Sequence, residues 1–456
     1  MFNPRKDIKV HFIGIGGIGM SGIAEVLLSL GYKVSGSDIA ESQTVLKLRD
    51  LGAEVYVGHK SENLNDATVV VFSSAIDETN PEIILAKSKR LPIMRRAEML
   101  AELMRLKYGL AIAGTHGKTT TTSFLATILQ ESQYDPTYII GGIVKNLDGH
   151  AKVGKGEFLV AEADESDGSF LLLNPIMSVV TNIDNDHMDH YGDEATLLDS
   201  FREFVNKVPF YGLNALNAHD ERLMAMTPEI KKPWVTFGIE IKADFEARNI
   251  KYVTNVATFD LFYKGSKAIE ITINIPGNHN ILNSLGAIAL AYNMGVSFEK
   301  IASSIIKFDG VGRRFQTLRE SGQFEIIDDY AHHPTEIDTT LKTMKETRPD
   351  KKIVVVFEPH RYSRTKDCWD NFLHCFNHAD EVYLSPIYPA SEKPIPGIES
   401  DRLISDINQL HPGLVKKLSN ISNLDEIVKK YENENVTLVT LGAGTIGRAI
   451  RAITDK

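Results

Sequence analysis

The chain has 456 residues, a formal net charge of −10, and 43% hydrophobic and 24% charged residues, which fits a globular protein of about three domains. The acidic balance, without a long basic run, argues against general binding to nucleic acid or acidic membranes. Two cysteines exclude a disulfide framework, and no apolar run approaches the ~18 residues of a membrane span. The first strand begins near Ile8, which leaves no room for a signal peptide, so we expect a cytoplasmic protein.

The first hundred residues alternate between short apolar strands and helical segments. A helical pattern runs from about Ile18 to Leu30, where Gly31 ends it, and another covers residues 95–106. This alternation predicts a parallel sheet with helices on its faces, here a Rossmann-like domain of residues 1–107. Its strands are expected at residues 8–15, 32–38, 53–58 and 68–75.

A glycine motif, GIGGIGMSG, follows the first strand and opens the first helix. Gly14, Gly16 and Gly19 fit GxGxxG, and Asp38 ends the second strand where a ribose-binding acid belongs. Taken alone, the motif says only that a diphosphate can approach backbone N–H groups. A nicotinamide dinucleotide and a UDP-sugar both carry such a diphosphate, so the motif fits either ligand.

A second phosphate-binding motif, AGTHGKTTTT, lies between an apolar strand and a helix. Its glycines let backbone N–H groups turn inward, Lys118 is expected to reach the β- and γ-phosphates, and Thr119 to bind Mg²⁺. The motif departs from the general pattern, because Ile112 stands where a glycine is usual and the glycine is at position 114. We expect residues 108–313 to form a P-loop α/β domain.

Acidic clusters follow the next two strands of this domain. In VAEADESDGS, alternation predicts Glu162 and Asp164 on one face of the strand end, on the same sheet edge as the phosphate loop. In NIDNDHMDH, His187 and His190 have a spacing that zinc can use, but a hard metal beside ATP phosphates fits better. The sequence therefore predicts a divalent metal site at this edge.

The remaining chain adds antiparallel strands and a third α/β unit. Residues 234–275 resemble antiparallel strands, as in an appended hairpin region, and residues 279–295 have helical spacing. Residues 314–456 alternate again and predict a Rossmann-like C-terminal domain. Cys368 and Cys375 lie seven residues apart in a stretch expected to be helical, where they are expected to be buried on one face.

Eight stretches together resemble the Mur ligases, in the order of that family and over nearly the whole chain. They are HFIGIGGIGMSGIAEVLLSLGYKVSGSD, GTHGKTTTT, EADESDGSF, TNIDNDHMDHYG, GNHNILNSLGAIA, GVGRRFQ, DDYAHHPTEI and EPHRYSRT. The resemblance implies a three-domain α/β fold that binds a UDP-sugar, ATP and an amino acid in turn. It thereby explains two phosphate-binding loops in one chain.

The activity implied by the resemblance is the ATP-dependent ligation of L-alanine to the lactyl carboxylate of UDP-N-acetylmuramate. The reaction passes through an acyl phosphate, gives ADP and phosphate, requires Mg²⁺ and serves peptidoglycan precursor synthesis. The implied partners are these small molecules, with no nucleic acid and no membrane, and the implied state is a monomer or weak homodimer.

The resemblance also assigns roles to residues, motif by motif. The UDP-sugar site would be formed by Gly14, Gly16, Gly17, Gly19, Asp38, Ser73 and Ser74. The ATP site would be formed by Gly114, Thr115, His116, Gly117, Lys118, Thr119, Thr120, His279, Asn280, Asn283 and Arg314, with Arg313 as the alternative arginine. The metal ligands would be Thr119, Glu162 and His187; the amino-acid site would be formed by Tyr330, His332, Arg361 and Arg364; and the catalytic groups would be Lys118, Glu162, His187 and His332.

Elementary chemistry supports several of these roles. A carboxylate is a poor electrophile, so ATP must convert it to an acyl phosphate, by positioning and by charge neutralisation. An amino acid is held by its carboxylate, to which Arg361 and Arg364 can bind bidentately. A base must free the α-amine, and His332 and His333 are both candidates. Lys207 is the first lysine after His187, too far on for the carbamylated lysine of many relatives, and we expect none.

Three other interpretations remain open from the sequence. A recycling ligase of the same superfamily would add a whole tripeptide to the same UDP-sugar. A nicotinamide-dependent oxidoreductase would account for only the first 40 residues. A P-loop kinase or nucleotide switch would account for the middle of the chain but predicts no UDP-sugar site.

Overall fold

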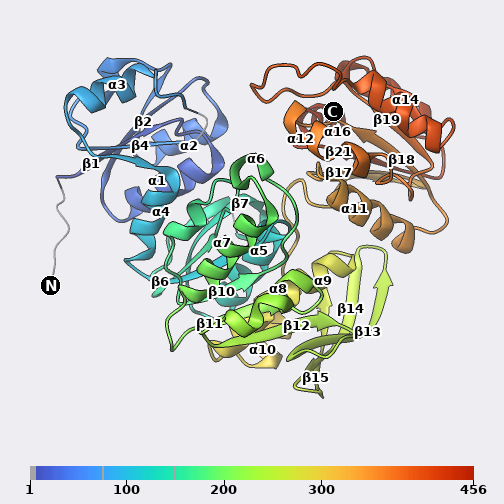
Figure 1. Cartoon of the computed structure of the whole chain (residues 1–456), viewed down its shortest axis with the longest axis horizontal. Helices are drawn as coiled ribbons and strands as arrows, with labels where there is room; N and C mark the ends of the chain where they lie inside the picture. The colour runs from blue at the N-terminus through green and yellow to red at the C-terminus, as the bar shows by residue number, and fades with distance from the viewer. Residues whose placement is uncertain (1–6, 74–75, 148, 456) are drawn as a thin grey trace. The chain divides into compact units, whose positions relative to one another are not determined.

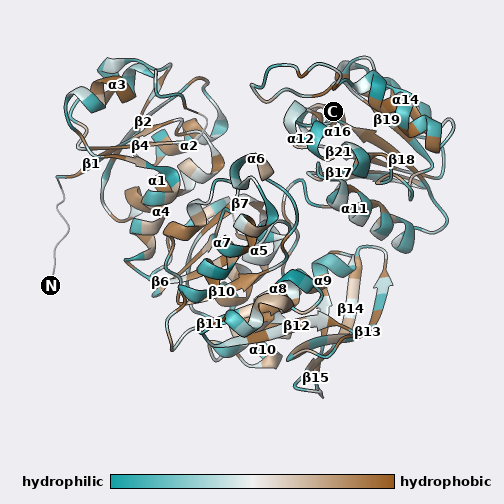
Figure 2. Cartoon of the chain, viewed as in Figure 1, coloured by the Kyte–Doolittle hydropathy of each residue, from teal (hydrophilic) through white to brown (hydrophobic). Residues whose placement is uncertain are grey.

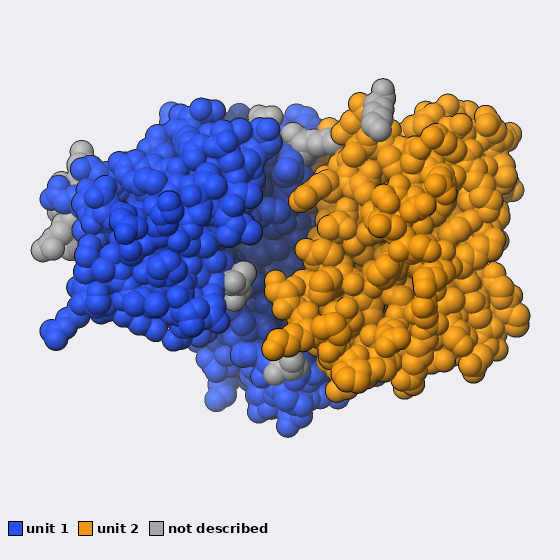
Figure 3. Space-filling view, turned by 90° about the horizontal axis from the view of Figure 1, so that it is seen from above, with its two compact units in different colours: residues 1–249, 259–272, 282–308 blue, residues 250–258, 273–281, 309–456 orange. Residues whose placement is uncertain are grey.

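The structure is a computed structural model that describes residues 7–73, 76–147 and 149–455. Three sheets follow one another along the chain (Figure 1). The chain divides into two compact units (Figure 3): unit 1 contains residues 1–249, 259–272 and 282–308, and unit 2 contains residues 250–258, 273–281 and 309–456.

The first sheet has five strands in the order β3-β2-β1-β4-β5, and each of its four neighbouring pairs is parallel. This is the predicted Rossmann-like arrangement, in which β1 is central and buried along its length. The strands are β1 Lys9–Ile13, β2 Lys33–Asp38, β3 Glu54–Val57, β4 Val69–Phe72 and β5 Ile93–Arg95. The helices are α1 Ile18–Ser29, α2 Gln43–Asp50, α3 Pro81–Ser88, α4 Arg96–Met104 and the short 3₁₀ helix η1 Ser61–Leu64.

The second sheet has ten strands in the order β15-β14-β13-β12-β11-β10-β6-β9-β7-β8. Its strands are β6 Tyr108–Ala113, β7 Thr137–Val144, β8 Gly149–Lys152, β9 Phe158–Glu162, β10 Met177–Val180, β11 Leu213–Asn217, β12 Trp234–Ile239, β13 Phe245–Val253, β14 Val256–Tyr263 and β15 Ser266–Ile273. The helices are α5 Lys118–Glu131, α6 Met188–Tyr191, α7 Glu194–Asn206, α8 Glu221–Met226, α9 Asn278–Asn293 and α10 Phe298–Ile305, with η2 Lys145–Leu147, η3 Ser169–Leu172 and η4 Thr227–Glu229.

One prediction for this sheet was wrong. Strand β12 was expected to belong to an antiparallel region, but it pairs in parallel with both β11 and β13. Within residues 234–275, hairpins are made by the two-residue connections after β13 and β14, since so short a link cannot join parallel strands. The expected appended region is therefore a direct continuation of the central sheet.

One hydrophobic core joins the first two sheets within unit 1. Helix α1 packs on β7 and β8. A Cβ at Gly22 would lie 3.2 Å from Ala151 Cβ and from Ile139 Cγ2, so the glycine permits this close approach. Beside it, Ser21 Oγ lies 3.0 Å from His150 Nε2.

The third sheet has the order β16-β17-β21-β18-β19-β20, in which β16 pairs antiparallel with β17 and the other neighbouring pairs are parallel. Strand β18 is apolar in Figure 2 and almost wholly buried. The strands are β16 Gln316–Ser321, β17 Phe324–Asp329, β18 Lys352–Phe357, β19 Glu381–Leu384, β20 Val415–Lys417 and β21 Val436–Leu441. The helices are α11 Pro334–Thr347, α12 Tyr362–Asp367, α13 Trp369–Phe372, α14 Ser400–Leu410, α15 Leu424–Tyr431 and α16 Ile446–Thr454, with η5 Ile421–Asn423.

The two cysteines are free and buried, as predicted. The expected continuous helix around them is absent from the described residues, because the chain breaks at Cys368 into the short helices α12 and α13. Both thiols instead pack in the core on one face of the third sheet. Across the described part of the chain, no helix combines the length and the apolar character needed to span a bilayer.

Candidate functional site

The second glycine motif forms a tight loop between β6 and α5 in unit 1. Gly114 has φ +124° and Gly117 has φ +83°, values that side chains other than glycine rarely adopt. A Cβ at Gly114 would lie 2.1 Å from Thr181 Oγ1, and one at Gly117 would lie 2.3 Å from Asn283 Oδ1. Both glycines are therefore required by conformation and by space. Helix α5 begins at Lys118, so its free N–H groups face the loop.

Lys118 curls back over this loop. Its ammonium donates to Gly114 O at 2.7 Å, to Thr115 O at 3.1 Å and to Glu165 Oε2 at 2.6 Å. Burial alone would lower the pKa of Lys118, but the neighbouring carboxylates, Glu165 foremost, raise it above its usual value. The lysine is thus a fixed positive charge at the loop.

Thr119 and Glu162 lie together at the carboxyl edge of the central sheet. The Thr119 hydroxyl donates to Glu162 Oε2 at 3.1 Å, and Glu162 Oε1 accepts from the Gly141 N–H. Asp164 lies beyond the end of β9 and pairs with Arg96 at 2.9 Å. Burial opposes the charged form of Asp164, but the charges of Lys118 and Arg96 lower its pKa overall, so this carboxylate also acts on the lysine of the phosphate loop. The shared face of Glu162 and Asp164 stays a prediction.

His187 precedes the short helix α6 in a left-handed conformation, with φ +59°. Its Nε2 lies 3.8 Å from Glu165 Oε1 and 3.6 Å from Asp186 Oδ2. Glu165 is buried, and this burial raises its pKa to about 7 although Lys118 opposes the shift. The predicted residues Lys118 and His187 are thus linked through a carboxylate that was not among the predicted site residues.

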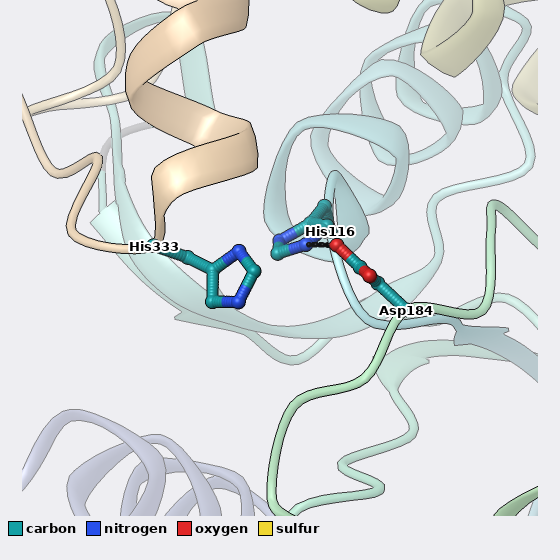
Figure 4. A group of neighbouring side chains, drawn as sticks. All are labelled: His116, Asp184 and His333. Atoms are coloured by element: carbon teal, nitrogen blue, oxygen red, sulfur yellow. Dashed lines mark hydrogen bonds and ion pairs between the residues drawn. The ribbon is translucent and has the colours of Figure 1, made fainter. Parts of the chain in front are cut away.

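The loop after β10 anchors the phosphate loop, and sequence reasoning missed its residues. Asn182 Oδ1 accepts from the His116 N–H at 2.8 Å, and Asn182 Nδ2 donates to His116 O at 3.0 Å. Thr181 Oγ1 donates to the same carbonyl at 2.6 Å. The His116 imidazole lies 3.0 Å from Asp184 Oδ2 (Figure 4). The available signal was that Thr181 and Asn182 directly follow an apolar strand beside β6.

The first glycine motif also forms a held turn in unit 1. The Gly16 N–H donates to Asp38 Oδ2 at 2.8 Å, so this carboxylate faces the loop. Gly14 has φ +80°, and a Cβ there would lie 3.3 Å from Ser73 Oγ. Gly17 precedes α1, and a Cβ at Gly19 would meet the Arg96 side chain at 3.1 Å. Ser74 lies outside the described residues.

A buried polar network supports this turn from below. Ser37 O accepts the N–H groups of Gly14 and Ile15 at 2.8 and 3.0 Å. Ser37 Oγ donates to the fully buried Glu82, which also accepts from Asn63 at 2.6 Å. Burial would raise the pKa of Glu82, but hydrogen bonds from His11, Ser37 and Asn63 lower it overall. The end of β2 is therefore fixed by charge and hydrogen bonds.

The predicted adenine segment is divided between the two units. In unit 1, Asn283 lies against Gly117, as noted above, and Thr120 is buried in α5. In unit 2, Asn280 Nδ2 donates to Pro276 O at 2.7 Å. Burial, followed by the charge of Arg314, lowers the pKa of His279 to about 4, so this imidazole is neutral near pH 7.

Unit 2 gathers the predicted arginines around one aromatic ring. The guanidinium carbons of Arg313 and Arg314 lie 4.9 and 5.0 Å from the centre of the Tyr330 ring. Arg313 donates to Gly442 O at 2.5 Å and lies 3.5 Å from Asp328. Because Arg313 is tied into the fold in this way, Arg314 is the better placed of the two for a ligand.

The two candidate histidines differ in their surroundings. His333 is buried, accepts the Thr335 N–H at Nδ1 as the cap of α11, and has Nε2 3.5 Å from Cys368 Sγ. The side chain of His332 is 16% exposed, and its Nδ1 lies 3.0 Å from Tyr330 O. A carbonyl only accepts, so Nδ1 carries the proton and the lone pair of neutral His332 is on Nε2.

Arg361 and Arg364 flank the start of α12. Arg361 has φ +72°, and its N–H donates to Tyr388 O at 2.9 Å. Between β18 and Arg361 lies His360, another residue that the sequence reasoning did not assign. Burial, together with the neighbouring charges of which His332, Arg364 and Arg361 are the largest, lowers the pKa of His360 to about 3. Arg361 and Arg364 therefore place positive charge beside this imidazole, which suits an anionic ligand.

Comparisons with known proteins agree along the whole chain. Three family models match in succession: the "Mur ligase family, catalytic domain" at residues 9–108, the "Mur ligase middle domain" at 112–291 and the "Mur ligase, glutamate ligase domain" at 313–444. A UDP-N-acetylmuramate–L-alanine ligase of Trichlorobacter lovleyi is 49% identical over 449 residues, which cover 98% of each chain.

Solved structures give the same picture. A UDP-N-acetylmuramate–alanine ligase of Thermotoga maritima superimposes with a TM-score of 0.84 at 30% identity, over 98% of both chains. A MurF ligase of Thermotoga maritima in complex with ADP gives a TM-score of 0.62 over 92% of this chain and 93% of its own. At 16% identity, this second similarity concerns the fold alone.

Proposed function

The chain belongs to the Mur ligase family, and from this membership we propose that it joins L-alanine to UDP-N-acetylmuramate in an ATP-dependent reaction of peptidoglycan precursor synthesis. The observation that carries the proposal is the 49% identity, across 98% of both chains, to a ligase named for this reaction. The phosphate loop with Lys118 supports the use of ATP, and ADP is bound by a relative of the same fold.

The first step activates the lactyl carboxylate. We propose that residues 114–120, with Asn283, His279, Asn280 and Arg314, bind ATP, and that Lys118 neutralises charge as the γ-phosphoryl group moves to a carboxylate oxygen. The bond between the β,γ-bridging oxygen and the γ-phosphorus breaks, and ADP leaves. The hydroxyl of Thr119 and the carboxylate of Glu162 are hard oxygen donors that fit Mg²⁺, and His187 is the third proposed ligand. When bound, this ion supplies further charge neutralisation.

The second step forms the amide. We propose that Arg361 and Arg364 hold the carboxylate of L-alanine beside Tyr330, and that Nε2 of His332 takes the proton from its ammonium. The free amine attacks the acyl carbon, and the tetrahedral intermediate collapses with loss of phosphate. His332 is favoured over His333 because the latter is buried and caps a helix.

The remaining proposals assign one ligand to each of three parts of the chain. We propose that residues 1–107 bind the UDP-sugar, residues 108–313 bind ATP and residues 314–456 bind the amino acid. Gly14, Gly16, Gly17 and Gly19 would hold the diphosphate, with Asp38, Ser73 and Ser74 near the nucleotide. We also propose a cytoplasmic enzyme that is a monomer or weak homodimer.

Phosphate release from ATP tests the proposal. The purified chain is incubated with Mg²⁺, ATP and UDP-N-acetylmuramate, together with L-alanine, the tripeptide of the recycling ligases, or no acceptor. Release that depends on L-alanine, and that is abolished in Lys118→Ala but kept in the exposed-site control Lys242→Ala, supports the alanine ligase. Release that requires the tripeptide would instead assign the chain to the recycling ligases.

A further inference from the structure

Glu165 is a buried carboxylate that the proposed mechanism does not use. Its side chain is 1% exposed, three residues beyond the end of β9. Its backbone carbonyl accepts from the Tyr191 hydroxyl and from the Gly168 N–H. Two contacts from different segments therefore fix the residue in place, and the side chain has a defined position relative to the phosphate loop.

One oxygen of Glu165 completes the bonding of Lys118. A lysine ammonium has three donors, and here they go to Gly114 O, Thr115 O and Glu165 Oε2. The carboxylate is the shortest of these contacts, the only charged partner and the only one from outside the loop. A phosphate can gain a full hydrogen bond from this ammonium only by replacing one of the three.

The other oxygen of Glu165 makes no hydrogen bond within the described part of the chain, although it is buried. The imidazole Nε2 of His187 lies 3.8 Å from this oxygen. A buried carboxylate oxygen without a donor is costly. The ion pair with Lys118 is therefore the main interaction that compensates the charge of Glu165.

We propose that Glu165 is a positioning residue that holds Lys118 on the phosphate loop in the nucleotide-free enzyme and competes with nucleotide phosphates for its ammonium. The inference rests on the proposed role of Lys118 in binding ATP. Its consequence is that nucleotide affinity is lower than the loop alone would give, because the phosphates must displace a carboxylate and approach its negative charge. Weaker product binding then speeds the loss of ADP.

The test is the affinity for ADP of the whole chain, measured by calorimetry in EDTA and without the other substrates. Glu165→Gln keeps the shape and a neutral acceptor but removes the charge. We expect it to bind ADP about five- to tenfold more tightly than the wild type, the ratio expected when a neutral hydrogen bond replaces a charge-assisted one. Glu165→Asp, which draws the carboxylate back from Lys118, should tighten binding in the same direction by a smaller factor.

Asp167→Asn is the matched control. It removes the same charge from the same segment, but its carboxylate accepts from the Ser169 N–H rather than from Lys118, and we expect its ADP affinity to change less than about twofold. Unchanged or weaker binding by Glu165→Gln overturns the proposal, as does equal tightening by Asp167→Asn. If Glu165→Gln fails to fold, as thermal unfolding would reveal, Glu165→Asp decides by the same criterion. A wild type that does not bind ADP would instead overturn the proposed ATP site, and this inference with it.

Discussion

The amide of Asn182 sets the shape of the phosphate loop through His116. It accepts the His116 N–H and donates to the His116 carbonyl, much as a neighbouring strand would. Replacing Asn182 with alanine removes both of these side-chain bonds, while the bond from the Thr181 hydroxyl to the same carbonyl is kept. The loop then loses two of the contacts that hold the His116 backbone in place.

The expected cost follows from the count of bonds. Each neutral hydrogen bond contributes ~0.5–1.5 kcal/mol net. The His116 carbonyl keeps its bond from the Thr181 hydroxyl, so the free energy lost with both Asn182 bonds is about 1–2 kcal/mol. If these bonds stabilise the loop conformation that binds ATP, their loss raises the KM for ATP about five- to thirtyfold. The effect on kcat should be smaller, because Asn182 itself contacts no proposed reacting group.

Initial rates of phosphate release at varied ATP concentration measure this effect. Asn185→Ala, three residues further on and exposed, is the control for altering an asparagine in this segment. A KM for ATP in Asn182→Ala no higher than in Asn185→Ala would refute the reasoning, since the loop would then hold its shape without the amide. Thermal unfolding of both variants separates a loop effect from general destabilisation.

Three further predictions follow from the geometry. Gly117→Ala places a Cβ 2.3 Å from Asn283 Oδ1 at a positive φ, so ADP binding by calorimetry should weaken at least about tenfold while UDP-sugar binding is kept. Glu325→Gln breaks a buried pair with Arg348 and should lower the free energy of unfolding by about 3 kcal/mol at pH 7. Because the pKa of Glu325 is held below its usual value, this difference from the wild type should shrink as the pH falls below 4.5. Calorimetric unfolding at pH 7 and below pH 4.5 checks both statements. Arg364→Ala should raise the KM for L-alanine about ten- to a hundredfold, with unchanged ADP affinity, in the phosphate-release assay.

The sequence was most informative where a strand is apolar and ends in glycine. Strand β1 before Gly14 and strand β6 before Gly114 were both predicted together with their helices, because each is largely apolar and leads into a glycine motif that opens a helix. The edge strands β16 and β20 were missed, since they are short, polar and largely exposed. The direction of β12 was wrong because direction depends on its neighbours in the sheet rather than on its own residues.

For the candidate site, motif positions were easier to predict than the residues that hold them. Lys118 and Thr119 were predicted from the residues GKT and from their position between an apolar strand and a helix. Asn182 acts through hydrogen bonds to a loop that is 66 residues away in sequence, so no local pattern marks it. Glu165 was visible as one acid among several, and only the fold shows that it accepts a hydrogen bond from Lys118 while Asp164 pairs with Arg96.

The first two sheets share one hydrophobic core, so a truncation between them exposes apolar surface. A fragment cut after residue 107 would uncover the face of α1 that packs on β7 and β8, with Gly22 at its centre. Such a fragment would aggregate or distort the first glycine loop, and ligand screening on it would report on an altered pocket. A shortened protein for screening should instead extend to residue 308, so that this helix keeps its cover.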